Sequence, residues 1–323
     1  MKLTAPPKFS WSATRGNTFE DCRRAYFYQY YLANGRAEGA DPDDVARAAR
    51  LKRLSSLPLW VGSRVHDAIE GVLREARDGG AADIEVAVER MVGQMRADYR
   101  ASTNGGTGKW KDFSSMLRFH EHEYAAETGR VLAPEDWTPR VESACAMLRA
   151  FPAHGYVERA RTLGPARVRA LEELEDWPLD DVKVYVKIDF AYEDDDNTVH
   201  IVDWKTGQRE HGETPIQMLG YALFAMKRWN VPIERLRVKE VFLAKDDTDR
   251  PCTITADTLA AAEQRMRRSI EAMLEALHDP RRDVARAERF EPTPSWRCRS
   301  CNFLALCDEG RAASRDAGRG GGA

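Results

Sequence analysis

The sequence predicts an α/β protein with a helical N-terminal region and a C-terminal segment that carries a cysteine cluster. Two observations predict this class. Helical periodicity dominates the first 160 residues, and the order strand–strand–strand–helix–strand follows Gly164. The chain has 323 residues, 43% of them hydrophobic and 31% charged, which is enough apolar content for a sizeable core.

The helices expected in the N-terminal region are amphipathic. Within residues 60–80, one apolar stripe is formed by Val65, Ile69, Val72 and Ala76, and the pattern ends at paired glycines. A second helix is expected over 83–100, and further helices are expected around 112–128 and 136–160.

The core begins with segments rich in β-branched and aromatic residues, separated by turn residues. Strands are expected at 166–177, 181–193 and 198–205, followed by a helix over 214–230, strands at 236–245 and 251–256, and a helix over 256–278. The helix after the third strand is expected to start with Thr214 as N-cap and Pro215 at its first position.

These elements divide the chain into four regions. They are a helical N-terminal region (1–160), an α/β core (161–280), a cysteine segment (281–310) and a tail expected to be disordered (311–323).

The composition limits where the protein works and what it binds. The net charge is −3, so a nucleic-acid surface has to be a local patch rather than a property of the whole molecule. The sequence contains no apolar run long enough to span a membrane, and its first residues lack the apolar core of a signal peptide. We therefore expect a cytoplasmic protein.

One predicted strand carries two opposite charges. In "VHIVDWKTG" (199–207), alternation places Asp203 and Lys205 on one face and Trp204 on the other. A second Asp-x-Lys, Asp181 to Lys183, opens the preceding strand beside an acidic turn, where an exposed charge pair is expected.

The preceding strand adds a further carboxylate. Asp189 stands between Ile188 and Phe190, so it is an acid inside an apolar run. Two carboxylates on neighbouring strands repel each other unless a divalent cation lies between them. The alternative is a buried salt-bridge network of Asp189, Asp203 and Lys205, which the spacing leaves open.

Three polar side chains on helices belong with this pattern. His66 lies beside the apolar stripe of its helix, where a hydrogen-bonded core histidine is the alternative to a ligand. Gln217 and Tyr221 are four residues apart and therefore share a helix face. Gln217 also fits a capping box with Thr214, and capping does not exclude a role in a site.

Taken in order, "GSRVH", "KID", "VDWKTG" and "QMLGY" resemble the RecB-like branch of the PD-(D/E)XK nuclease superfamily. The resemblance implies a restriction-endonuclease-like core, in which helices flank a mixed central sheet, and hydrolysis of phosphodiesters. One departure is Val186, where relatives usually carry a small residue.

The same resemblance implies roles for the residues of these motifs. His66, Asp189 and Asp203 would bind Mg²⁺ or Mn²⁺ with the main-chain carbonyl of Trp204. Lys205 would position the attacking water. Gln217 and Tyr221 would support the active site or the DNA backbone.

Four of the six cysteines form a pattern. Cys298, Cys301 and Cys307 are spaced C-x2-C-x5-C near one end of the chain, and Cys22 stands near the other. This pattern resembles the iron–sulfur segment of AddB-type and CRISPR-adaptation nucleases, in which four thiolates hold a [4Fe–4S] cluster. A four-cysteine Zn²⁺ site and free thiols are the alternatives.

The two remaining cysteines have no such pattern. Cys145 and Cys252 fall in a predicted helix and a predicted strand, and both are interpreted as buried packing residues.

Arginine and aromatic residues surround these cysteines. Cations interleaved with aromatic rings suit single-stranded DNA, whereas the tyrosines can equally pack a helix against the cysteine segment. The candidate DNA-binding residues are Arg23, Arg24, Arg297 and Arg299, and the aromatic residues are Tyr26, Tyr28, Tyr30, Tyr31 and Trp296.

The combined pattern predicts a metal-dependent DNA exonuclease that acts on single-stranded ends in recombination, repair, phage DNA metabolism or CRISPR adaptation. The alternatives are a non-catalytic DNA-binding scaffold with the same fold, and a zinc-containing structural protein with a buried ion-pair network. The sequence contains no ATP-binding P-loop, so any unwinding requires a helicase partner. A recombinase or integrase partner and oligomerisation are compatible with the same pattern.

Overall fold

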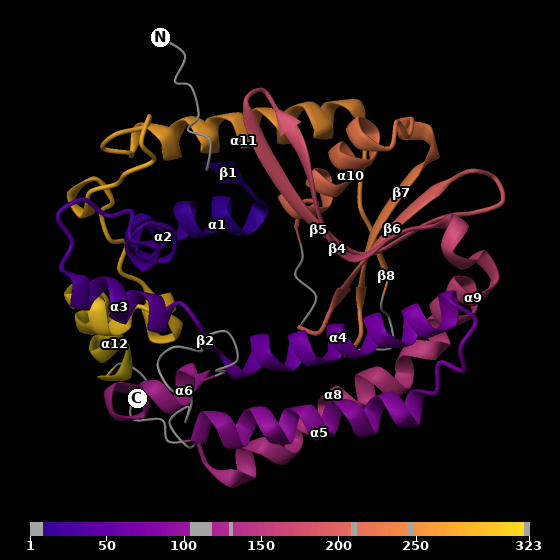
Figure 1. Ribbon diagram of the computed structural model, residues 1–323, viewed down its shortest axis with the longest axis horizontal. Helices are drawn as coiled ribbons and strands as arrows, with labels where there is room; N and C mark the ends of the chain where they lie inside the picture. Colours follow the sequence, from indigo (N-terminus) through magenta and orange to yellow (C-terminus); the bar gives the residue numbers. More distant parts are fainter. Residues whose placement is uncertain (1–8, 104–117, 129–131, 208–211, 245–248, 320–323) are drawn as a thin grey trace.

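The computed structural model describes residues 9–103, 118–128, 132–207, 212–244 and 249–319. The elements are arranged in a ring (Figure 1). Helices α4 (Leu57–Arg77), α5 (Ile84–Thr103) and α8 (Trp137–Ala150) form one side. Helices α10 (Ile216–Arg228) and α11 (Ala256–Glu275) lie opposite them beyond the sheet.

The remaining helices close the ring and connect its sides. They are α1 (Ala13–Asp21), α2 (Arg23–Tyr30), α3 (Pro42–Leu51), α6 (His120–Glu123), α7 (Ala125–Thr128), α9 (Tyr156–Arg167) and α12 (Asp308–Arg319). The Asn302 amide donates to the Leu54 carbonyl and the Tyr28 hydroxyl donates to the Leu306 carbonyl, each at 2.8 Å, so segments from the two ends of the chain lie together.

A six-stranded mixed sheet forms the centre of the fold. Its strands are β1 (Ser10–Trp11), β4 (Val168–Leu179), β5 (Val182–Glu193), β6 (Val199–Lys205), β7 (Leu236–Phe242) and β8 (Asp249–Pro251). A separate parallel pair joins β2 (Leu54–Ser55) to β3 (Arg118–Phe119).

The sheet confirms the predicted α/β class with a mixed central sheet flanked by helices. Strands β4 and β5 form an antiparallel hairpin, β6 runs antiparallel to β5, and β7 runs parallel to β6. Strand β1 pairs in parallel with β5, so the N-terminal region also contributes to the sheet. Because β4 occupies one edge of β5 along its length, β1 and β6 share the other edge.

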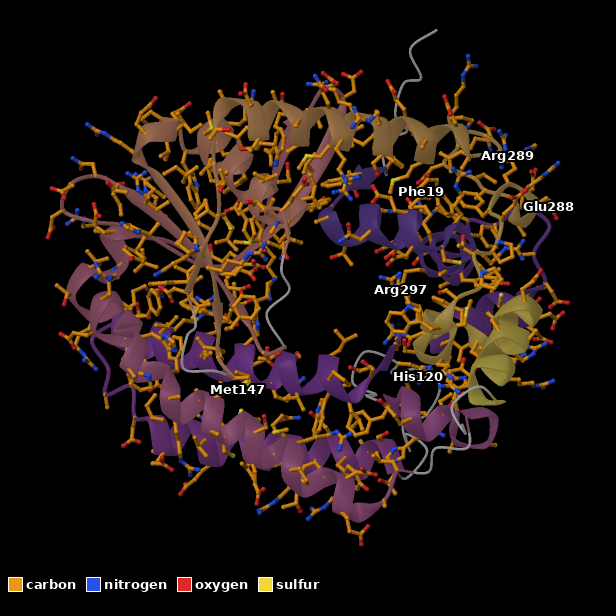
Figure 2. The ribbon with its side chains drawn as sticks, turned by 180° about the vertical axis from the view of Figure 1, so that it is seen from behind. Phe19, His120, Met147, Glu288, Arg289 and Arg297 are labelled. Atoms are coloured by element: carbon orange, nitrogen blue, oxygen red, sulfur yellow. The ribbon has the colours of Figure 1, made fainter. Side chains whose placement is uncertain are left out.

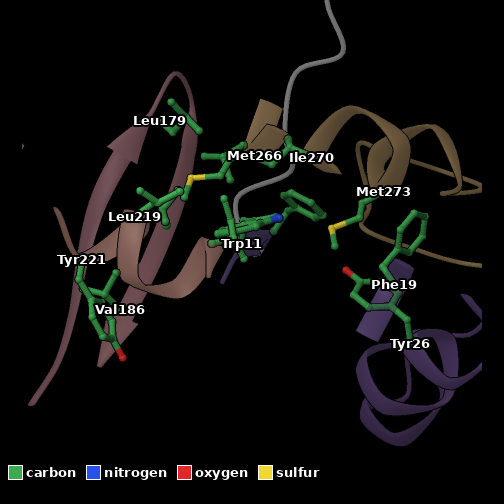
Figure 3. Close-up of a cluster of buried hydrophobic side chains, with 14 of the residues drawn as sticks. Trp11, Phe19, Tyr26, Leu179, Val186, Leu219, Tyr221, Met266, Ile270 and Met273 are labelled. Atoms are coloured by element: carbon green, nitrogen blue, oxygen red, sulfur yellow. The ribbon is translucent and has the colours of Figure 1, made fainter. Parts of the chain in front are cut away.

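Alternate side chains of β6 point to opposite faces of the sheet and belong to two different hydrophobic clusters. Val199 and Ile201 belong to the cluster beneath α10 and α11, whereas Val202 and Trp204 belong to the cluster that includes α4. In the first cluster, Trp11, Met266 and Ile270 pack between the N-terminal segment and α11 (Figure 3). Asp203 therefore faces α10, as the alternation predicts.

Two predicted helices differ from the structure. Residues 118–128 of the helix expected over 112–128 form β3, α6 and α7, and 112–117 lie outside the described residues. The helix expected over 136–160 is interrupted, because a 3-10 turn over Phe151–His154 ends at Gly155 with φ 74° before α9 begins.

Three boundaries of the core and tail also differ. Helix α10 starts at Ile216, and the expected capping box is absent because the Thr214 hydroxyl accepts from the Thr253 N–H instead. The last strand of the sheet is β8, so most of 251–256 is not a strand. Helix α12 occupies most of the segment that was expected to be a disordered tail from 311.

Among the described residues, no helix combines the length and apolar character required to cross a bilayer.

Candidate active site

The charged end of β6 packs against one face of α10. Lys205 Nζ lies 2.5 Å from Asp203 Oδ2 and 3.3 Å from Gln217 Oε1. The Gln217 amide donates to Tyr221 Oη at 2.7 Å and to Asp203 Oδ1 at 3.3 Å. The Tyr221 hydroxyl donates to the Lys187 carbonyl at 2.5 Å, on the edge of β5 that lies between β1 and β6. The structure therefore brings these predicted residues together.

Asp189 on β5 is buried next to this group. Its Oδ2 accepts the Trp204 N–H at 2.8 Å, which ties the carboxylate to β6. Burial and the negative charge of Asp203 raise the pKa of Asp189 well above its usual range, and nearby His66 opposes the shift. Because the carboxylates of Asp189 and Asp203 repel each other, a cation or a proton bound between them would be stabilising.

His66 reaches the same place from α4. Its Nε2 lies 3.1 Å from the Trp204 carbonyl oxygen, and its Nδ1 lies 3.1 Å from Glu172 Oε1 and 3.5 Å from Asp189 Oδ2. Burial lowers the pKa of His66, but the Glu172 hydrogen bond and the surrounding carboxylates outweigh it and raise the pKa to about 9. His66 is therefore part of an acidic cluster rather than an isolated core histidine.

Glu172 on β4 completes the cluster and was missed by sequence reasoning. In the hairpin register, Leu171 pairs with Phe190 and Glu173 with Ile188, so Glu172 stands opposite Asp189. Counting back from the hairpin turn would have placed an acid opposite Asp189. Its left-handed φ of 57° could not have been anticipated from the sequence.

Glu240 on β7 is a second acid that the sequence analysis missed. It pairs with Asp203 in the parallel register, and its carboxylate lies 3.8 Å from Lys205 Nζ and 3.2 Å from Arg250 Nη1. Burial raises the pKa of Glu240, and Lys205 opposes that shift. Lys205 therefore stands between two buried carboxylates, which explains why a lysine is tolerated there.

The donor atoms of this site fit a hard divalent cation. One ligand atom each from His66, Glu172 and Asp189 lie within 4.8 Å of one another. Asp203 Oδ2 is buried without a hydrogen-bond partner, although the Lys205 ammonium forms an ion pair with it. Carboxylate oxygens with one imidazole suit Mg²⁺ or Mn²⁺.

The four predicted cysteine ligands converge although they come from opposite ends of the chain. A small apolar pocket is lined by Cys22, Cys298, Cys301 and Cys307. Backbone N–H groups point at three of these sulfurs: Thr293 N–H at Cys22, Ser295 N–H at Cys298 and Gly310 N–H at Cys307, at 3.3–3.5 Å. Four thiols that line one pocket are the donor set that a thiolate-bound metal group would use.

The two other cysteines lie apart from this pocket. Cys145 is buried in α8, as expected for a packing residue. Cys252 follows β8 and is only partly buried against the core, so its predicted place in a strand is wrong.

The aromatic residues around the pocket have different roles. Tyr26, Tyr28 and Tyr31 are buried in the core, and the Tyr28 hydroxyl donates to the Leu306 carbonyl at 2.8 Å. The packing interpretation therefore holds for these three tyrosines. Trp296, in contrast, is 71% exposed.

The predicted DNA-binding arginines are divided in the same way. Arg24 donates to the Phe290 carbonyl at 2.8 Å and so braces the segment before the cysteines. Arg23 lines a surface pocket together with Arg265 and Arg268 of α11. Arg297 and Arg299 are exposed, and Figure 2 shows Arg297 on the same side of the ring as Phe19 and His120.

A protein-family model matches most of the chain. The family model of the PD-(D/E)XK nuclease superfamily matches residues 10–308, which include both the acidic cluster and the four cysteines of the pocket. No curated protein matches the chain.

Proposed function

The chain belongs to the PD-(D/E)XK nuclease superfamily, and from this premise we propose that it is a Mg²⁺- or Mn²⁺-dependent DNA exonuclease of the RecB-like branch that acts on single-stranded ends. The observation that carries the proposal is the meeting of His66, Asp189, Asp203 and Lys205 at the end of β6. A metal-dependent hydrolase needs a set of metal ligands, and here the ammonium group of Lys205 lies beside them.

Each side chain has a role in this proposal. His66, Asp189 and Asp203 would hold the metal with the Trp204 carbonyl. The metal, when bound, would polarise the phosphodiester and activate a water molecule. Lys205 would orient that water. Burial lowers the pKa of Lys205, but Asp203 outweighs it and raises the pKa above the ordinary value, so the ammonium donates hydrogen bonds.

The residues on α10 would keep Lys205 and Asp203 in place. Gln217 contacts both, and Tyr221 donates to the Lys187 carbonyl on the edge of β5. Such contacts would restrain the Lys205 ammonium and the Asp203 carboxylate, as the positioning of reacting groups requires.

The cysteine pocket would hold a [4Fe–4S] cluster that joins the two ends of the chain. Cys22 lies 276 positions before Cys298, and the pocket brings both to one place. Closing so long a loop restricts the unfolded chain, so the cluster would stabilise the fold. A single Zn²⁺ bound by the same thiolates is the alternative that metal analysis tests.

The test is cleavage of end-labelled linear single-stranded DNA by anaerobically purified full-length protein with Mg²⁺, Mn²⁺ or EDTA. We expect metal-dependent shortening of the linear strand, no cleavage of a circular strand, and loss of activity in Lys205→Ala. The matched control is Lys183→Ala, which alters the exposed lysine of the second Asp-x-Lys and should leave activity unchanged.

Two results would contradict the proposal. Cleavage of the circle would show an endonuclease. Binding of DNA without cleavage under any metal would support a scaffold that retains the fold but not the chemistry.

A further inference from the structure

We infer that Glu172 is a positioning residue that Lys187 holds in place, and that it fixes the orientation of His66 at the metal position. The inference rests on the proposed metal site. It assigns a function to Glu172, which lies outside the sequence motifs, and to Lys187, the first residue of the KID motif, to which no role was given above.

The backbone at Glu172 is in an unusual conformation. Its φ of 57° lies in the left-handed region inside a long strand, where a residue with a side chain is disfavoured. Such a conformation persists when surrounding contacts impose it, and it concentrates at functional sites. Here the side chain is buried opposite Asp189.

The two carboxylate oxygens of Glu172 have separate partners. Oε1 lies 3.1 Å from His66 Nδ1, and Oε2 lies 2.7 Å from Lys187 Nζ. Only 4% of the Glu172 side chain is exposed, against 55% for Lys187, so the lysine reaches in from the surface. Asp189 Oδ2 lies 3.5 Å from the same imidazole nitrogen, so Glu172 makes the closer of the two carboxylate contacts with His66 Nδ1.

The contact between Glu172 and Nδ1 of His66 also affects the other ring nitrogen, Nε2. His66 Nε2 lies 3.1 Å from the Trp204 carbonyl oxygen. When the ring is neutral, an Nδ1–H that donates to Glu172 leaves the Nε2 lone pair free beside that carbonyl. A carboxylate behind a ligating histidine sets its tautomer and ring orientation in this way.

The test measures Mn²⁺ binding to the full-length protein without DNA, by calorimetry. We expect Glu172→Gln to weaken binding by about 10–100-fold, the usual effect of removing such a partner. Lys187→Ala should weaken binding by a smaller factor, and its exposed position leaves the fold intact. Lys183→Ala on the same strand is the control, since Lys183 pairs with Asp176 at 3.3 Å and should leave affinity unchanged.

A double-mutant cycle with His66→Ala separates positioning from direct ligation. If Glu172 acts through His66, Glu172→Gln causes no further loss once the imidazole is absent. A further tenfold loss in that background would make Glu172 a ligand and overturn the inference.

Wild-type affinity in Glu172→Gln would also overturn the inference while leaving the metal site intact. Wild-type protein that binds no Mn²⁺ would instead overturn the metal site itself, and the inference with it.

Discussion

Gly62 of α4 lies directly against Thr206, the residue that follows β6. A Cβ atom at position 62 would stand 3.0 Å from Thr206 Oγ1, closer than side chains normally approach. One helical turn later, His66 contacts the carbonyl of Trp204 at 3.1 Å. The glycine therefore allows α4 to approach the strand end closely enough for the histidine to reach the site.

This contact predicts different outcomes for two glycines of the same helix. Gly71→Ala should stabilise the protein by about 0.5–1 kcal/mol, because alanine favours the helix and a Cβ there meets nothing within 4 Å. Gly62→Ala should not increase stability, because its Cβ would lie too close to Thr206 Oγ1. Chemical denaturation measures the free energy of unfolding of each variant. Adding Thr206→Ala to Gly62→Ala should restore the stabilisation. Equal stabilisation at both positions would contradict the argument.

Removal of Lys205 should destabilise the fold as well as abolish cleavage. Lys205→Ala leaves Asp203 and Glu240 buried without their shared cation. We expect a loss of about 1–3 kcal/mol, less than for a fully buried pair because the lysine is partly exposed. Urea unfolding is the measurement. The exposed pair of Lys183 with Asp176 serves as control, and Lys183→Ala should change stability by less than about 0.5 kcal/mol.

The pKa of His66 predicts how metal-free stability depends on pH. The folded pKa of about 9 exceeds the ordinary value of 6.5, so the charged imidazole stabilises the fold fully below pH 6.5. That contribution, on the order of 1–3 kcal/mol, is lost as pH rises through 9. Unfolding of wild type and His66→Asn in EDTA should therefore differ most at low pH and converge above pH 9. A constant difference would exclude this coupling.

The cysteine pocket predicts different consequences for two partly buried cysteines. Cys22→Ser should lower iron and sulfide content and destabilise the protein by roughly 3 kcal/mol or more, because the long loop is no longer closed. Cys252→Ser should keep full iron content, since burial raises the pKa of that thiol to about 12 and it lies outside the pocket. Stoichiometric zinc without iron in the wild type would support the alternative metal.

Arg297 and Arg299 are expected to bind phosphates of the single strand. Replacing both with alanine should lower the slope of log affinity against log salt by about 0.7 for each phosphate that the protein no longer neutralises. Fluorescence anisotropy with single-stranded DNA gives that slope. Arg286→Ala is a suitable control, because Arg286 forms a closer ion pair, with Glu38 at 2.8 Å, than Arg297 does with Asp21 at 3.4 Å. An unchanged slope in the double variant would place the DNA elsewhere.

Much of the site follows from local sequence patterns. Alternation along β6 placed Asp203 and Lys205 on one face, and helical spacing placed Gln217 and Tyr221 together. These relations span a few residues, so the period of one strand or helix is sufficient to predict them. The predicted cap at Thr214 is wrong because Thr214 Oγ1 accepts from the distant backbone N–H of Thr253. A contact between segments so far apart in the sequence cannot be predicted from local patterns.

The α/β class, the strands β4 to β7 and the charged residues of the site can be predicted from the sequence, because periodicity and residue type are local properties. Which side chains meet depends on the folded chain. Only the strand register sets Glu172 against Asp189 and Glu240 against Asp203. Only folding brings Cys22 to Cys298 and Gly62 to Thr206, since contacts between distant segments depend on packing of the whole chain.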